Sequence, residues 1–593
     1  MKDHVYKYLI FKAISYTLHH PLRFITMKHL FTLVGCLVLL AGTGWAADPT
    51  KPNIIVIMTD DMGFSDIGCY GGEIQTPNLD RLAVSGMKFS QFYNCSKCEP
   101  SRAALVTGHQ WYDYDAKVDV RKETPTFGEV VRAAGYRTMM VGKWHCAGSP
   151  FTRGFDRHFG FMGGGTDYFQ GDKTFTLDGK PWPVPTQGFY ATSILSTHAV
   201  QFIRDERQAH PNKPFFLYVG FNAPHAPLQA LPEDVAKYRG KYLKGWDVIR
   251  QERYAKQQAL GLAGLGWRFP ERPATIPAWD TLSDQEKAFE DLRMATYAAM
   301  VDRVDYGVGA IVKTLEELTI RDNTLIVFLN DNGASPNDRG RKGGLGMPGS
   351  KWNVGLAWAQ VSNTPFKFYK RTQNSGGVTT PCIANWPAVI KPQPVYNDQP
   401  CHIADILPTL IELAGGNYPQ HFGGKRLPPL PGRSFASILT NNAVLPPRTI
   451  YFSLFSNMAV VDNGWRLVTA YGQPWQLFDL THDRTETTDV ARTNPEQFQR
   501  MLALQKAFSV RDDVRQRLLA GEREPSYARI YREDGTIGPG ANEDLVNPAL
   551  NLALVKEMAK GLQPSPEEIE VLRRKNLRVK MPKKADEGDI ATE

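Results

Sequence analysis

Short apolar runs alternate with helix-period patterns through most of this chain. Four runs have the length and residue types of buried strands: Ile54–Met58, Thr138–Val141, Phe215–Val219 and Thr324–Leu329. From Val301 to Leu318, apolar residues recur every three or four positions, which predicts an amphipathic helix before the last of these strands. The alternation predicts an α/β sheet whose strands are joined by crossover helices.

A second, smaller unit is expected after residue 440. With 593 residues, the chain exceeds what a single compact core holds. Pro and Gly crowd residues 418–433, as in a connection between domains. Short strand-like runs follow at 449–452, 458–461, 465–468 and 475–478, and Asn463-Gly464 between two of them is a hairpin signal.

The predicted organisation therefore has four parts. They are a signal peptide over residues 1–47, a main domain over 48–440, an antiparallel-sheet subdomain with a helix near 495–510 over 441–545, and a charged, partly disordered extension over 546–593.

The first residues have the pattern of an export signal. An apolar run from Leu30 to Leu40 follows Lys28, and Gly44 and Ala46 match the small residues before a cleavage site. The run is shorter than the roughly 20 residues that span a bilayer, so no stable transmembrane anchor is expected. We predict a periplasmic or secreted protein. Met27 is an alternative start, and a lipoprotein signal ending at Cys36 is a less favoured alternative.

The charge balance gives little support for a nucleic-acid partner. The formal net charge is +8, but residues 1–47 hold five Lys/Arg and one Asp, so +4 is left without them. The sequence contains no Lys/Arg-rich block interleaved with aromatic residues. Nucleic-acid binding is therefore not expected.

Polar residues follow each of the four predicted strands. In chain order, these are Asp60-Asp61, Lys143-Trp144-His145, Asn222-Ala223-Pro224-His225 and Asp331-Asn332. Ligands of open α/β sheets bind beyond the carboxyl ends of the strands. We therefore expect the four sets to meet in one site, although each alone fits an ordinary loop or helix cap.

Four of these residues, Asp60, Asp61, Asp331 and Asn332, offer oxygen atoms as ligands. Three carboxylates gathered together repel one another unless a cation neutralises them. An all-oxygen set suits Ca²⁺ or Mg²⁺ better than Zn²⁺, which favours His and Cys. One divalent cation is therefore predicted, provided that the two segments lie together.

The stretch Cys98-Glu99-Pro100-Ser101-Arg102 carries the most information. Pro100 suits the first turn of a helix, and Gly108 is typical of a helix end. Cys98 is therefore expected at a helix N-terminus, where sulfate or phosphate is stabilised. Without this context, a single Cys is more often a small buried hydrophobic residue.

Together, these segments resemble the sulfatase family of the alkaline-phosphatase superfamily. The Cys98–Arg102 stretch matches the signature C-x-P-S-R, and Leu105–Gly108 matches its continuation. Further matching segments follow in family order: Pro52–Ile55, Thr76–Asp80, Gly142–His145, Ala223–Pro227, Asp331–Gly333 and Leu477–Leu480. The resemblance implies a large, mixed, mostly parallel sheet flanked by helices, with a smaller C-terminal α+β subdomain.

The resemblance also implies hydrolysis of sulfate esters. A separate formylglycine-generating enzyme would oxidise Cys98 to formylglycine, whose hydrate offers a hydroxyl that attacks the sulfur atom. By the same likeness, the metal, with Ca²⁺ favoured over Mg²⁺, is held by Asp60, Asp61, Asp331, Asn332 and the modified Cys98. The substrate would be a sulfated small molecule or glycan.

The remaining roles are implied in the same way. Arg102 and Lys143 would hold formylglycine and the sulfate charge, and Lys370 would be a further cation for the sulfate. His145 would be the base that releases the covalent sulfate by elimination, and His225 the acid that protonates the leaving alcohol.

One position departs from the family pattern. Relatives commonly place Glu five residues after the family lysine, whereas Ser375 follows Lys370 at that spacing. Lys351 and Lys367 therefore compete with Lys370. Two other functions stay open: a phosphatase or phosphodiesterase of the same superfamily, and a non-catalytic relative that binds sulfated glycans.

Overall fold

The structure is a computed structural model. It describes residues 51–110, 120–264, 266–338, 342–454, 457–470 and 473–509. The predicted signal peptide and the extension over 546–593 lie outside these ranges. So does the end of the predicted subdomain beyond residue 509. Within the described ranges, none of the helices combines the length and the apolar character needed to cross a membrane.

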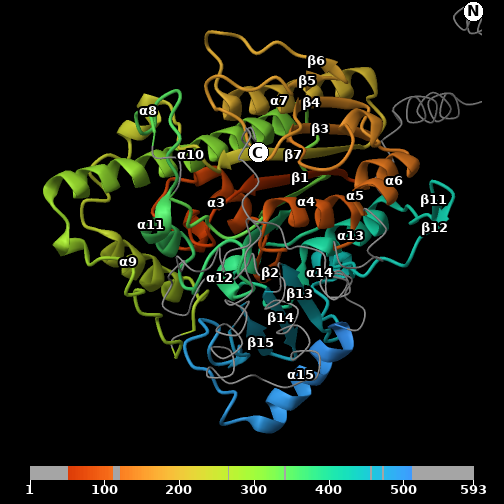
Figure 1. The fold of residues 1–593 in the computed structure, drawn as a ribbon. Helices are drawn as coiled ribbons and strands as arrows, with labels where there is room; N and C mark the ends of the chain where they lie inside the picture. The colour runs from red at the N-terminus through yellow and green to blue at the C-terminus, as the bar shows by residue number, and fades with distance from the viewer. Residues whose placement is uncertain are drawn as a thin grey trace, which may run out of the picture. The chain divides into compact units, whose positions relative to one another are not determined.

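A ten-stranded sheet forms the centre of the described fold (Figure 1). Its order is β10-β2-β9-β8-β1-β7-β3-β4-β5-β6. The strands are β1 Asn53–Asp60, β2 Met87–Tyr93, β3 Arg137–Lys143, β4 Arg157–Phe161, β5 Thr176–Leu177, β6 Lys180–Pro181, β7 Phe215–Pro224, β8 Thr324–Asn330, β9 Thr379–Asn385 and β10 Cys401–His402.

The four strands predicted from the sequence are neighbours, in the order β8-β1-β7-β3. They pair in parallel, so their carboxyl ends share one edge of the sheet. β9 pairs antiparallel with β2 and β8, and β5 pairs antiparallel with β4 and β6. The large, mixed, mostly parallel sheet is confirmed.

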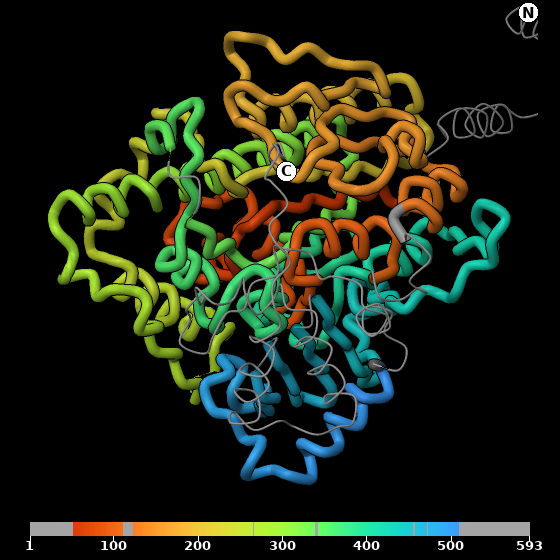
Figure 2. Tube along the Cα trace, viewed as in Figure 1, coloured from red at the N-terminus to blue at the C-terminus, as the bar shows by residue number. Residues whose placement is uncertain are grey.

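The side chains of β1 alternate between two cores. Ile55 and Ile57 pack into a core that includes residues of α3 (Pro77–Val84), α7 (Ala191–Ala209) and α10 (Asp284–Glu317). Ile54, Val56 and Met58 pack into the other, with α4 (Cys98–Thr107), α6 (Phe127–Ala133) and α13 (Ile406–Ala414). Burial of both faces explains why β1 is a continuous apolar run. Figure 2 shows β1, in red, running through the middle of the fold.

The helix predicted over 301–318 begins earlier than its apolar periodicity indicates. α10 starts at Asp284, where Ser283 and Glu286 form a capping box. Ser283 Oγ accepts a hydrogen bond from Glu286 N at 3.3 Å, and Glu286 Oε2 accepts one from Ser283 N at 2.8 Å. The first turns are charged, so hydrophobic periodicity does not mark them.

Smaller elements connect these layers. Apart from α15 of the C-terminal subdomain, the remaining helices of the described part are α5 Val120–Glu123, α8 Pro232–Ala236, α9 Trp246–Ala259, α11 Gly355–Ser362, α12 Ser375–Val378 and α14 Ala436–Asn441, with 3-10 turns at Gly68–Tyr70, Pro150–Thr152, Trp279–Thr281 and Ile403–Asp405. A two-stranded ribbon of β11 (His421–Phe422) and β12 (Lys425–Arg426) lies in the predicted connection over 418–433.

The predicted C-terminal antiparallel sheet is present. It consists of β13 Ile450–Leu454, β14 Asn457–Asp462, β15 Trp465–Thr469 and β16 Gln476–Asp479, followed by α15 Pro495–Ser509. Asn463 and Gly464 join β14 to β15 with φ values of 46° and 78°, as a two-residue hairpin with a type I′ turn requires. One face of the sheet packs on α15, and the other packs on Tyr93 and Val378 of the main sheet region.

Candidate active site

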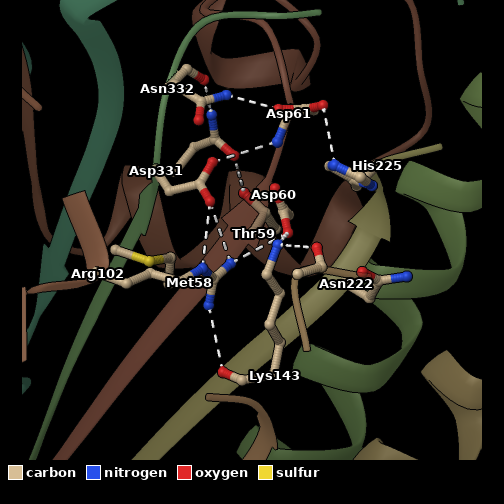
Figure 3. A network of polar contacts seen from close by, with 12 residues as sticks. Met58, Thr59, Asp60, Asp61, Arg102, Lys143, Asn222, His225, Asp331 and Asn332 are labelled. Atoms are coloured by element: carbon tan, nitrogen blue, oxygen red, sulfur yellow. Dashed lines mark hydrogen bonds and ion pairs between the residues drawn. The ribbon is translucent and has the colours of Figure 1, made fainter. Parts of the chain in front are cut away.

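Most of the predicted site residues converge beyond the carboxyl ends of β1, β3, β7 and β8. Asp60 is the last residue of β1 and Lys143 the last of β3, whereas His225 follows β7 and Asp331 follows β8. Figure 3 shows the side chains that meet there: Asp60, Asp61, Arg102, Lys143, His225, Asp331 and Asn332. The shared edge of the parallel strands therefore gathers the predicted site.

Cys98 is the first residue of α4, as predicted. Lys97 is the N-cap in an extended conformation, and Gly108 ends the helix with a φ of 72°. Cys98 is buried. Burial alone would raise the pKa of the Cys98 thiol, but the charges of Lys370 and Lys143 outweigh this effect and lower it. The helix therefore presents residue 98 to the cations of the site.

Arg102 lies one helical turn after Cys98 and is fully buried. Its Nη2 is 3.4 Å from Asp60 Oδ2 and 3.2 Å from Asp331 Oδ2. Its Nη1 donates a hydrogen bond to the hydroxyl of Tyr218 at 3.0 Å. The guanidinium thus bridges the acidic groups of two strands.

Two lysines reach the same carboxylates. The Nζ of Lys143 contacts Asp60 Oδ2 and the carbonyl oxygen of Gly164. The Nζ of Lys370 lies 2.5 Å from Asp61 Oδ1. Of the competing lysines, Lys351 is exposed, and Lys367 donates from its Nζ to the carbonyl oxygen of Glu486 at 3.0 Å. The geometry therefore brings Lys370, and neither competitor, to Asp61.

The electrostatics of the acidic residues favour a cation among them. Burial and the neighbouring Asp60 charge raise the pKa of Asp331 well above its usual value, against the effect of Arg102. Burial would raise the pKa of Asp60 too, but Lys143, His225 and Arg102 lower it. The pKa values of these two adjacent buried carboxyl groups are thus shifted in opposite directions, and a bound cation would favour the charged form of both.

Two oxygen atoms of this group have no hydrogen-bond partner among the described residues: Oδ1 of Asp60 and Oδ1 of Asn332, both buried. The Nδ2 of Asn332 donates to Asp61 Oδ1 at 2.6 Å, which fixes the orientation of the amide. Ligand atoms of Asp60, Asp61 and His225 lie within 4.8 Å of one another. Buried, unsatisfied oxygens fit a hard divalent cation.

Two histidines flank the acidic group. His225 places Nε2 3.6 Å from Asp61 Oδ2, while its Nδ1 lies 2.6 Å from the carbonyl oxygen of Ala226. Because that oxygen only accepts hydrogen bonds, Nδ1 carries the proton in the neutral ring. Burial, together with Lys143 and Arg102, lowers the pKa of His145 to about 3. His145 is therefore neutral near pH 7.

A glycine segment that the sequence motifs did not include, Gly163–Gly165, lies beside these histidines. A Cβ at position 164 would lie 3.1 Å from Nε2 of His145, and one at position 165 would lie 3.5 Å from Nδ1 of His225. Three consecutive glycines shortly after β4 were a visible signal. The contact of the Gly164 carbonyl with Lys143 could not be predicted from the type of residue at position 164, because every residue carries a backbone carbonyl group.

Comparison with known proteins gives consistent matches. The family model for sulfatases matches residues 52–416. An arylsulfatase of Klebsiella aerogenes is 32% identical over 448 residues, covering 68% of this chain and 95% of the relative. An N-acetylglucosamine-6-O-sulfatase of Bacteroides thetaiotaomicron is 26% identical over 508 residues, covering 74% of this chain and 82% of the relative.

Among solved structures, the crystal structure of Ps i-CgsB in complex with k-i-k-neocarrahexaose is similar to this fold. The TM-score is 0.57 at 28% sequence identity, covering 78% of this chain and 93% of that one. The family match extends over more than half of the chain and includes the Cys98 helix and all of the converging residues. The chain therefore belongs to the sulfatase family.

Proposed function

We propose that this protein hydrolyses sulfate esters, with Cys98 converted to formylglycine. One observation carries the proposal. Cys98 begins a helix at the edge where Arg102 bridges Asp60 and Asp331, and the charges of Lys143 and Lys370 act on its side chain. A helix N-terminus beside several fixed cations suits the anionic sulfate group and the charge that develops on its oxygens.

The donor set fits one divalent cation, with Ca²⁺ favoured over Mg²⁺. Its ligands would be Asp60, Asp61, Asp331, Asn332 and the modified residue 98. When bound, the cation and the formylglycine hydrate supply a Lewis acid and an activated hydroxyl group. Arg102 keeps Asp60 and Asp331 at a fixed separation, because its Nη2 contacts both.

The two histidines are assigned opposite proton transfers. His225 points Nε2 toward Asp61 and, in its doubly protonated form, keeps the Nδ1 proton on the Ala226 carbonyl and donates the Nε2 proton to the leaving alcohol, which leaves the ring neutral. His145, neutral near pH 7 because burial lowers its pKa to about 3, accepts the proton when sulfate is released. The different surroundings of the two rings support these roles.

The substrate is proposed to be a sulfated small molecule or glycan. The printed names of the relatives, an arylsulfatase and an N-acetylglucosamine-6-O-sulfatase, and a related structure with a bound neocarrahexaose support this class. The predicted signal peptide supports export to the periplasm or beyond. Maturation requires a formylglycine-generating enzyme as a partner.

The test compares release of sulfate from a chromogenic aryl sulfate with release of phosphate from the matching aryl phosphate. The protein is co-expressed with a formylglycine-generating enzyme, and Cys98→Ala is compared with Cys69→Ala, a cysteine on the Gly68–Tyr70 turn. Wild type and Cys69→Ala should release sulfate and lose activity with a chelator, whereas Cys98→Ala should be inactive. Preference for the phosphate, or full activity of Cys98→Ala, would overturn the proposal.

A further inference from the structure

We propose that Glu486 and Arg466, on the C-terminal subdomain, position Lys370 in the active site. The inference rests on the proposed role of Lys370 as a cation for the sulfate group. Residues 370–375, here called the Lys370 loop, begin at that lysine and make hydrogen bonds to residues of the C-terminal sheet. Glu486 and Arg466 are positioning residues, because they contact the loop at residues 373–375, beyond Lys370 in the chain.

Glu486 binds the end of the Lys370 loop. Its Oε1 accepts hydrogen bonds from Ser375 N at 2.9 Å and from Ser375 Oγ at 2.5 Å. Its Oε2 accepts one from Asn374 Nδ2 at 2.7 Å. The side chain is fully buried, where a carboxylate is stable only with such donors. Ser375 stands where the family commonly has Glu. The carboxylate of Glu486, 111 residues further along the chain, contacts this position.

Arg466, on β15, completes this contact. Its Nε lies 3.3 Å from Glu486 Oε1, and both side chains are fully buried. Its Nη1 donates to the carbonyl oxygen of Gln373 at 2.6 Å. Asn457, on β14, donates from Nδ2 to the carbonyl oxygen of Arg371 at 3.1 Å. The C-terminal subdomain therefore binds the Lys370 loop at several points.

The Lys370 loop also contacts the segments that carry Cys98 and Asp331. The backbone N of Arg371 donates to the carbonyl oxygen of Ser96 at 2.6 Å, and Gln373 Nε2 donates to Ser96 Oγ at 2.9 Å. Ser96 precedes Cys98 by two residues. The backbone N of Lys370 donates to the carbonyl oxygen of Ala334 at 3.2 Å, just after the Asp331 segment. The loop thus fixes Lys370 relative to both Cys98 and the acidic residues.

Loss of the Glu486 charge should therefore displace Lys370, while the reacting groups keep their chemical identity. In Glu486→Gln, we expect kcat/KM for an aryl sulfate to fall roughly 10-fold to 100-fold, the range for residues that orient groups at a reaction centre. A double-mutant cycle with Lys370→Ala separates this role from a general one. If Glu486 acts through Lys370, adding Glu486→Gln to Lys370→Ala should cost less than about twofold.

Two further variants control for destabilisation. Glu486→Gln combined with Arg466→Met removes both charges of the buried pair, so no uncompensated charge remains, and should show the same loss of kcat/KM. Asp462→Asn breaks the Arg500–Asp462 ion pair at the far end of β14 and should lower the Tm with kcat/KM unchanged. Full activity in Glu486→Gln, or losses that multiply in the cycle, would overturn the inference.

Hydrogen exchange of the peptide covering residues 367–377 provides a readout independent of turnover. Faster exchange in Glu486→Gln than in wild type and Asp462→Asn supports the positioning role, and equal exchange overturns it. An inactive wild type in the aryl sulfate assay would instead count against the proposed function. The two failures are therefore distinguishable.

Discussion

The Nε of Arg102 donates a hydrogen bond to Oδ2 of Asp331 at 3.3 Å, and both side chains are fully buried. Because Arg102 belongs to the helix that Cys98 begins, this contact joins the residue proposed as the nucleophile to the proposed metal ligands. Removal of Arg102 takes a buried cation from both Asp60 and Asp331, and removal of Asp331 leaves the guanidinium with Asp60 alone. The pair therefore contributes to both the geometry and the stability of the site.

Arg102→Lys should damage both properties. An ammonium group cannot reproduce the planar fork that contacts Asp60 and Asp331 together. We expect kcat/KM to fall at least about 100-fold and the free energy of unfolding to fall by roughly 3 kcal/mol. Aryl sulfate kinetics and urea unfolding measure these effects. Tyr218→Phe, which removes one of the two acceptors of Nη1 and leaves the Lys143 carbonyl, is the matched control. Equal kinetics for both variants would contradict the assigned role of Arg102.

A divalent cation should stabilise the protein independently of activity. Chelator-treated protein is titrated with Ca²⁺ or Mg²⁺ while the Tm is recorded, and a cation at 100 times its Kd adds about 2.7 kcal/mol. Asp331→Asn should reduce this stabilisation, since it removes one anionic ligand, whereas the exposed Asp280→Asn should not. Absence of any Tm shift with either cation in wild type would argue against a metal site.

The assignment of His225 as the acid predicts a dependence on the leaving group. A nitrophenolate leaves without protonation, whereas an alkoxide requires it. His225→Gln should therefore slow an alkyl sulfate by about 100-fold or more and a nitrophenyl sulfate much less. His145→Gln is the comparison, because its proposed proton transfer follows departure of the alcohol. Equal losses of His225→Gln on both substrates would rule out this role.

The buried histidine His158 should make stability depend on pH. Burial lowers its pKa from 6.5 to about 3, so the folded protein keeps the ring neutral while the unfolded chain binds a proton below pH 6.5. Stability is therefore present above pH 6.5 and is lost as the pH falls toward 3. We expect His158 to account for about 2 kcal/mol of the loss between pH 7 and pH 5.

Urea unfolding of wild type and His158→Asn at the two pH values measures this effect. The Asn amide can replace the ring nitrogen that meets Thr176 Oγ1 at 3.2 Å. The variant should lose less stability on acidification than wild type does. His482→Asn, at an exposed position, reports the effect of removing a surface imidazole. Identical pH dependence of wild type and His158→Asn would refute the prediction.

The strand-end residues were predictable because parallel strands place their carboxyl ends at one edge. Asp60, Lys143, His225 and Asp331 could therefore be grouped before their distances were known. The start of α4 was predictable from Pro100 and its end from Gly108, because both signals are local.

Other features depend on contacts that no local pattern encodes. Glu486 reaches Ser375 across the interface between the two sheets, and the Gly164 carbonyl that contacts Lys143 is a backbone group. Edge strands such as β10, two residues long, carry too few residues for a period to appear. These parts of the site became visible only when distant segments were placed side by side.

Mass spectrometry of the peptide that contains residue 98, taken from catalytically active protein, tests the proposed nucleophile most directly. Conversion of Cys98 should appear as an aldehyde that reacts with a hydrazide probe, in a peptide lighter than the unmodified thiol form. The converted fraction should rise in proportion to the specific activity on an aryl sulfate. Fully active protein whose Cys98 remains an intact thiol would contradict the formylglycine mechanism.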